Sequence, residues 1–205
     1  MKAHLSALAA AVVCVASFAP AMSAQEPPPA TEVGAAQLVL LTAPAKGGAK
    51  LTVSSPAFKQ MGDIPFENTQ YKGNVFPGLS WSAGPKGTTS YVIVMQDADA
   101  MRNGAPILHW TMINIPGSVT KLDAAMSAPP AGASYGPNIR GANQAYMGPR
   151  TPAGPKHRYH LQVFALDAQL PADNIVTFDA LTGAMKGHVL ASGEVIGLGQ
   201  FMAPN

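Results

Sequence analysis

The sequence predicts an antiparallel β domain with few and short helices. The chain has 19 prolines and 20 glycines in 205 residues, which leaves little room for long helices. Runs of β-branched and aromatic residues recur between these prolines and glycines, as is typical of strands joined by turns. A helical spacing of apolar residues appears only near the C-terminal end.

Residues 1–24 have the composition of a cleavable secretory signal peptide. Lys2 precedes an apolar run from Leu5 to Ala19, and small residues follow as far as Ala24. The apolar run is too short for a membrane span. Cleavage would also remove Cys14, the only cysteine. We therefore expect a periplasmic or secreted protein with no disulfide framework and no transmembrane segment in the mature chain.

The rest of the chain divides into a lead segment and one domain. Residues 25–50 are rich in Pro, Ala and Gly, which predicts a flexible arm, and residues 51–205 form the predicted domain. Strands are expected in "LTVSSPAF", "NVFPGLSW", "TTSYVIVM", "HWTMINI", "HRYHLQVFAL" and "GEVIGLGQF". Residues 178–192 predict a short helix, with Thr177 or Asp179 as its cap.

The charge of the chain excludes one class of partner. The formal net charge is +2 and only 12% of the residues are charged, with no basic stripe that could neutralise phosphates along a nucleic acid. We expect no nucleic-acid partner, and we predict no cofactor and no metal.

Alternation along the predicted strands places three ionisable residues on apolar faces. Asp97 shares a face with Met95, and His109 shares one with Ile113. His157 likewise shares a face with the apolar residues of its strand. Each of the three stands at a strand end beside a loop, where a scaffold commonly presents functional groups. Burying ionisable groups is costly unless they are paired, so these three are candidates for one site.

Two catalytic or metal-binding interpretations fit the residues less well. Ser134 lies in "GASYG", which matches the nucleophile-elbow pattern, but Pro129, Pro130 and Pro137 leave no room for the strand and helix that an elbow needs. A metal set of Asp97 with two histidines lacks any further ligand motif. His160, spaced H-x-x-H from His157, points to the opposite face of the strand, as Arg158 does.

An anion pocket uses all of the remaining residues. Imidazoles of His109 and His157, the Tyr159 hydroxyl and backbone N–H groups of the loop at Gly148 and Pro149 suit a phosphate-like group. A carboxylate such as Asp97 beside a histidine orients the ring and favours its charged form. We predict that both histidines donate to the anion.

Two ordered blocks carry a resemblance to a known family. "SYVIVMQDADA" with "HWTMINIP", and "GANQAYMGPRTPAGPKHRYHLQVFALD", resemble the two sequence blocks of the phosphatidylethanolamine-binding protein family. "NVFPGLSW" and "GHVLASGEVIG" resemble its bacterial branch, described as Raf kinase inhibitor-like. The likeness runs from about Leu51 to Phe201.

The resemblance implies a fold of two packed antiparallel sheets with short peripheral helices and a surface pocket for phosphate-type anions such as phospholipid headgroups. It places Asp97, His109, Gly148, Pro149, His157 and Tyr159 in that pocket, with Asp99, Trp110 and Met101 in support. It brings no settled catalytic activity, so no catalytic residue is assigned, and it leaves a homodimer open.

The chain departs from the family pattern at "DADAM", where the family has prolines after each aspartate. Without these prolines we expect a less rigid loop and a larger, softer rim at Met101. The sequence also ends soon after the last predicted strand, so we expect no C-terminal helix of the kind that covers the ligand in longer relatives, and therefore a more open pocket. A signal peptide also makes an intracellular kinase an unsuitable partner. The favoured function is a non-catalytic, exported anion-binding protein. The alternatives are an inhibitor of an exported enzyme such as a protease, and a weak hydrolase that uses Asp97 and a histidine.

Overall fold

The computed structural model describes residues 25–203, so the predicted signal peptide at residues 1–24 lies outside the described residues. The strands are β1 (Ala49–Lys50), β2 (Val53–Ser54), β3 (Gly62–Asp63), β4 (Leu79–Trp81), β5 (Ser90–Arg102), β6 (Ala105–Pro116), β7 (Lys121–Leu122), β8 (Ser134–Tyr135), β9 (His157–Leu166) and β10 (Val189–Gly199). The α-helices are α1 (Val39–Thr42) and α2 (Phe178–Met185), and the 3-10 turns are η1 (Ala35–Gln37), η2 (Lys46–Gly48), η3 (Phe66–Asn68) and η4 (Ala172–Asn174).

The strands form two sheets, which confirms the predicted mainly β fold. The large sheet has the order β1-β10-β9-β5-β6-β8, with β3 also paired to β10, and the small sheet has the order β2-β4-β7. The long strands β5, β6, β9 and β10 pair antiparallel, whereas the short strands β1 and β3 run parallel to β10.

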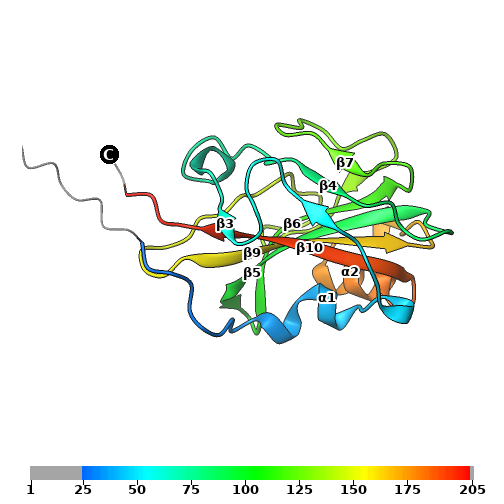
Figure 1. The fold of residues 1–205 in the computed structure, drawn as a ribbon. Helices are drawn as coiled ribbons and strands as arrows, with labels where there is room; N and C mark the ends of the chain where they lie inside the picture. The colour runs from blue at the N-terminus through cyan, green and yellow to red at the C-terminus, as the bar shows by residue number, and fades with distance from the viewer. Residues whose placement is uncertain (1–24, 204–205) are drawn as a thin grey trace, which may run out of the picture.

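The large sheet has a hydrophobic core on each face. One core lies between the two sheets, where Leu79 and Trp81 of β4 pack with residues such as Met95 and Leu161. The other core joins the large sheet to α1 and α2 through residues that include Leu181. Figure 1 shows the same arrangement, with the helices on one side of the long strands and β4 and β7 on the other. Both faces of the large sheet are therefore covered.

Irregular pairing between β5 and β6 changes which residues share a face. The register shifts between Met95, which pairs with Trp110, and Gln96, which pairs with Leu108, so His109 is the extra residue of a β-bulge. Leu108 and Ile113 belong to the core beside the helices, whereas Trp110 belongs to the core between the sheets. The predicted shared face of His109 and Ile113 was wrong, because simple alternation does not pass through a bulge.

The lead segment, which its composition assigns to a flexible arm, packs along the large sheet. Leu38, Val39 and Ala43 are buried. The backbone N–H of Val39 donates to Gln96 Oε1 at 3.0 Å, and that of Leu40 donates to Gln162 Oε1 at 2.7 Å. Composition misses this packing because only a few apolar residues of the segment contact the sheet. We call residues 25–43 the N-terminal strap.

The C-terminal helix is shorter than its sequence pattern suggests. Helix α2 begins after Thr177, whose hydroxyl accepts a hydrogen bond from the Ala180 N–H at 3.1 Å, as predicted for its cap. It ends at Met185, and Gly187 has a φ of 77°. Val189 is therefore not on the helix but begins β10. In residues 25–203 no helix is long and apolar enough to cross a membrane.

Candidate functional site

The centre of the predicted site is an ion pair between two neighbouring strands. Asp97 of β5 pairs in register with Tyr159 of β9, so His157 lies two residues from it along β9. The Nδ1 atom of His157 donates to Asp97 Oδ2 at 2.9 Å. Asp97 is 2% exposed, and the side chain of His157 is 14% exposed. A buried carboxylate therefore holds a histidine that keeps some contact with solvent.

Asp99, two residues further along β5, supports this pair. The backbone N–H of Asp99 donates to Asp97 Oδ1 at 2.9 Å. Its carboxylate accepts from Arg158 Nε at 2.8 Å and from Arg158 Nη2 at 2.5 Å, which is a two-pronged contact. Arg158 of β9 therefore holds Asp99, and with it the stretch of β5 that carries Asp97.

His109 lies on the same side of the sheet, because of the bulge in β6. Its ring packs edge-on against Tyr159, with the ring centroids 5.0 Å apart. Its Nδ1 lies 3.1 Å from the Met147 carbonyl oxygen and 3.2 Å from that of Gly148. Carbonyl oxygens only accept hydrogen bonds, so Nδ1 carries the proton, and Nε2 of the neutral ring is an acceptor. In this form the free Nε2 of His109 can only accept a hydrogen bond, whereas the sequence analysis predicted that His109 donates.

The loop at Gly148 uses its polar backbone groups internally. The N–H of Gly148 donates to Asn74 Oδ1 at 2.7 Å, and its carbonyl oxygen accepts from Gln70 Nε2 at 2.7 Å. Gly148 and Pro149 are both buried. The Gly148 N–H is therefore not free to donate to an anion, contrary to the prediction from the sequence. The loop instead provides the carbonyl oxygens that accept the Nδ1 proton of His109.

The two histidines have opposite electrostatic settings. Burial lowers the pKa of His109 by more than the charge of Asp97 and the two carbonyl partners raise it, so this ring is neutral near neutral pH. Burial also acts to lower the pKa of His157, but the hydrogen bond and charge of Asp97 outweigh it and the net pKa is raised. Near neutral pH the two histidines therefore differ: His109 offers a hydrogen-bond acceptor, and the positively charged form of His157 is favoured.

Tyr159 closes the floor of the cluster. It is 1% exposed, and its hydroxyl lies 3.0 Å from Thr151 Oγ1. Burial, and then the charge of Asp97, raise the pKa of the Tyr159 hydroxyl well above its ordinary value, so it stays protonated. His109 is 5% exposed, and the His157 side chain, at 14%, is the most exposed of the three rings of His109, His157 and Tyr159. The site is therefore more closed than the sequence differences from the family pattern suggested.

The other two supporting residues lie apart from the ion pair. Trp110 is fully buried and packs against Phe76 and Tyr146 in the core between the sheets. Met101 is 37% exposed, and a Cβ atom built on Gly34 of the strap would lie 2.9 Å from its sulfur. Met101 therefore packs against the strap.

A second polar layer, which the sequence pattern missed, lies on the opposite face of the sheet. His160 points there, as predicted, and its Nδ1 lies 2.8 Å from Glu194 Oε2. Glu32 of the strap lies 3.1 Å from His160 Nε2, off the axis of a hydrogen bond, and 3.2 Å from Arg158 Nη1. Arg158 joins this layer to Asp99 and so to the site. No sequence signal marks Glu32, because its partners come from a distant strand.

Glu32→Gln should therefore destabilise the fold although the strap looks dispensable by composition. The substitution removes the carboxylate that faces Arg158 and His160, which are 8% and 2% exposed. Because Glu32 keeps 18% exposure and Arg158 retains Asp99, we expect a loss of about 1–2 kcal/mol in the free energy of unfolding, below that of a fully buried pair. Urea denaturation measures it, with Glu67→Gln on an exposed turn as the control. Equal stability of the two variants would contradict the role of the strap.

The structure also bears on the two other chemistries. Ser134 lies in β8 and pairs with Ile113, so it does not stand on a strand-to-helix elbow. Among residues 25–203, no group of three or more His, Cys, Asp or Glu side chains is placed to hold a metal ion. The ring nitrogens of His109 and His157 make their protein hydrogen bonds to carbonyl and carboxylate oxygens, and no described serine, threonine or cysteine hydroxyl or thiol contacts them.

Comparison with known proteins identifies relatives across nearly the whole described chain. A family model described as Phosphatidylethanolamine-binding protein matches residues 54–200. A UPF0098 protein from Methanothermobacter thermautotrophicus is 32% identical over 152 residues, which is 72% of this chain and 97% of the relative. A putative lipoprotein, LppC, from Mycobacterium tuberculosis is 34% identical over 179 residues, covering 84% of this chain and 85% of the relative.

Two crystal structures share the fold. Escherichia coli YbcL, described as a new member of the mammalian PEBP family, matches with a TM-score of 0.68 and 26% identity, over 75% of this chain and all of YbcL. A putative PEBP homologue from Chlamydia trachomatis matches with a TM-score of 0.65 and 27% identity, over 76% of this chain and 99% of the homologue.

Proposed function

Because the chain belongs to the phosphatidylethanolamine-binding protein family, we propose that its Asp97–His157 site binds a phosphate-type anion without catalysing a reaction. The observation that carries this proposal is the ion pair itself, in which Asp97 occupies Nδ1 of His157. The Nε2–H of the charged His157 ring is then left to donate to a ligand.

The second histidine gives the proposed ligand a further property. The neutral His109 ring, protonated at Nδ1, offers an acceptor at Nε2. A phosphate that keeps at least one proton carries both an acceptor for His157 and a P–OH donor for His109. A phosphoethanolamine headgroup meets the same requirement with its phosphate and its ammonium group. The shared ligand chemistry is an anionic oxygen next to a hydrogen-bond donor.

We further propose that the protein acts outside the cytoplasm, in the periplasm or as a secreted protein. The signal-peptide pattern in residues 1–24 and the description of the relative LppC as a putative lipoprotein both favour export. The ligand would then be met at or beyond the outer face of the inner membrane. Cell fractionation with antibody detection tests this proposal, and a chain found at full length in the cytosol would contradict it.

Isothermal titration calorimetry with a matched pair of variants tests the binding proposal. His157→Gln removes the ring that pairs with a buried aspartate, and His188→Gln removes an exposed ring that pairs with Asp167 at 2.7 Å. For each ligand, inorganic phosphate or phosphoethanolamine, we expect His188→Gln to have the same affinity as the wild type. We expect His157→Gln to bind each ligand at least about tenfold more weakly than the wild type does. Equal affinities for all three proteins would refute the site.

The titrations also separate the sources of the anion and the other functions. Phosphoethanolamine binding much tighter than phosphate would favour a lipid headgroup, and equal binding would favour free phosphate. The Asp97–His157 pair is also the arrangement of a general base, which keeps the hydrolase alternative. Turnover of 4-nitrophenyl phosphate or acetate that disappears in His157→Gln would favour that alternative over non-catalytic binding.

A further inference from the structure

A separate cavity of about 240 Å³ lies on the helix-bearing face of the large sheet. It is open to solvent, and it is lined by the end of the β5–β6 hairpin, by β6 at Leu108, by the loop at Ile139 and by the first residue of α2, Phe178. Leu108 belongs to the core beside the helices, whereas the His109 ring packs on Tyr159 in the opposite direction. The cavity is therefore distinct from the Asp97–His157 site.

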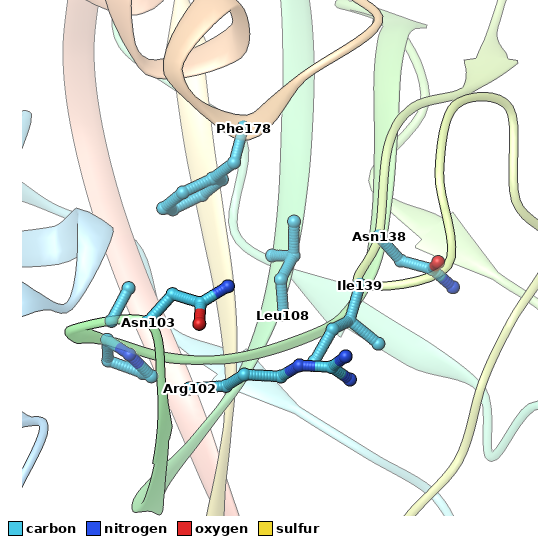
Figure 2. Close-up of a pocket in the computed structure, with 8 residues that line it drawn as sticks. Arg102, Asn103, Leu108, Asn138, Ile139 and Phe178 are labelled. Atoms are coloured by element: carbon cyan, nitrogen blue, oxygen red, sulfur yellow. The ribbon is translucent and has the colours of Figure 1, made fainter.

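One half of the cavity is apolar. Figure 2 shows Phe178 on one side of the space, with Leu108 and Ile139 across from it. Leu108 is 6% exposed and Phe178 is half-buried, so both surfaces are firmly placed by the core behind them. This half suits an aromatic or branched aliphatic group.

The other half carries a cation without a protein partner. Arg102 is the one charged residue in the lining, and no described residue forms a hydrogen bond or ion pair with its guanidinium. Asn103 next to it likewise has no described side-chain partner. Figure 2 shows Asn103 to the left of Leu108, and Arg102 below Leu108 with its guanidinium beside Ile139.

The turn that carries these two residues is rigid. Arg102 pairs with Ala105 across a two-residue connection, and Asn103 and Gly104 have φ values of 53° and 79°. Positive φ at both central residues is the geometry of a type I′ hairpin turn, for which Asn-Gly is a favoured sequence. The hairpin thus fixes the backbone from which the Arg102 side chain extends beside the apolar cavity.

We propose that this cavity binds a small organic carboxylate with an aromatic or branched apolar body. The carboxylate would pair with the Arg102 guanidinium, whose planar fork matches two carboxylate oxygens, and the body would lie between Phe178 and Ile139. The volume is below that of most drug-sized sites, which limits the ligand to a compact molecule.

The cavity wall is continuous with the backbone that holds His109. Asn138 Nδ2 donates to the His109 carbonyl oxygen at 3.2 Å, and the Ile139 N–H donates to the Leu108 carbonyl oxygen at 3.0 Å. A bound carboxylate would contact this loop from the helix side without contacting the His109 ring. Resonances of the loop residues therefore report on the cavity even if the anion site has another function.

Benzoate is the probe, followed by ¹H–¹⁵N NMR on the isotope-labelled chain. Saturable shifts are expected for the amides of residues 102–105, 107–108, 138–139 and 178, with a dissociation constant on the order of 1 mM for so small a ligand. Arg102→Gln should weaken benzoate at least about tenfold, because it removes a charge-assisted contact. Benzamide, the neutral analogue, lacks the carboxylate. Its affinity for the wild type should therefore be no higher than the affinity of benzoate for Arg102→Gln.

Arg150→Gln is the matched control, since Arg150 is also exposed but does not line the cavity. It should leave benzoate affinity unchanged. The proposal is overturned if both arginine variants lose affinity equally, if benzamide binds as tightly as benzoate, or if no saturable shift appears at about tenfold above 1 mM. A shift confined to His157 and its neighbours would place benzoate in the anion site and would also overturn it.

Discussion

Asp97→Asn should lower the pH at which phosphate binds and should destabilise the fold at mildly acidic pH. The amide cannot carry the negative charge that pairs with His157 at 2.9 Å, while burial still acts to lower the pKa of that ring. His157 then becomes neutral near pH 7 and loses the Nε2–H charge that the proposed ligand needs. We expect at least about tenfold weaker phosphate binding at pH 7.5, with partial recovery at pH 5.5.

The sign of the stability change follows from the raised pKa of His157. A group whose pKa is raised on folding stabilises the folded state fully below its unfolded pKa, and this contribution disappears as the pH rises through the folded pKa. The wild type should therefore exceed Asp97→Asn by about 1–3 kcal/mol at pH 6 and by clearly less at pH 9. Urea denaturation at both pH values measures this difference. A difference that grows with pH would contradict the assigned ion pair.

Gly148→Ala should damage both stability and the setting of His109. A Cβ atom at this position would overlap the carbonyl oxygen of Asn68, and it would lie 3.1 Å from Asn74 Oδ1. Backbone cannot yield as a flexible side chain can, so the loop must move, at an expected cost of about 2–3 kcal/mol. The movement would also displace the carbonyl oxygens of Met147 and Gly148 that hold the His109 Nδ1 proton.

Thermal unfolding and histidine NMR together measure this effect. Gly183→Ala in α2 is the control, because a Cβ atom there meets nothing within 4 Å and alanine favours the helix, so this variant should be as stable as the wild type or more. If Gly148→Ala unfolds at the wild-type temperature with His109 still protonated at Nδ1, the close contact has no functional role.

The sequence pattern was sufficient for the fold because strand signals in this chain are local. The run "HRYHLQVFAL" is β9 without a change of bounds, and its alternation places His157 and Tyr159 together toward one face. The Asp97–His157 contact joins residues 60 positions apart on two paired strands. The predicted strand-end position holds for His157, which begins β9, but it was wrong for Asp97, which lies inside β5 because that strand continues to Arg102.

Other parts of the site depend on features that no local pattern encodes. The bulge at His109 is set by the pairing of β6 with β5, so alternation within β6 could not place that ring correctly. Glu32 acquires its role only when the strap packs on β9, far away in the sequence. The hydrogen bonds that occupy the Gly148 backbone likewise come from distant loops, at Gln70 and Asn74.

The most direct test of the central claim is a ¹⁵N NMR titration of the histidine rings, with and without inorganic phosphate. We expect His157 to titrate above its ordinary pKa and His109 to stay neutral with its proton on Nδ1. Phosphate should raise the pKa of His157 further and shift the Nε2 resonances of both rings, while His188 stays unchanged. A His109 proton on Nε2, or the same response of His157 and His188 to phosphate, would contradict an anion site at Asp97 and His157.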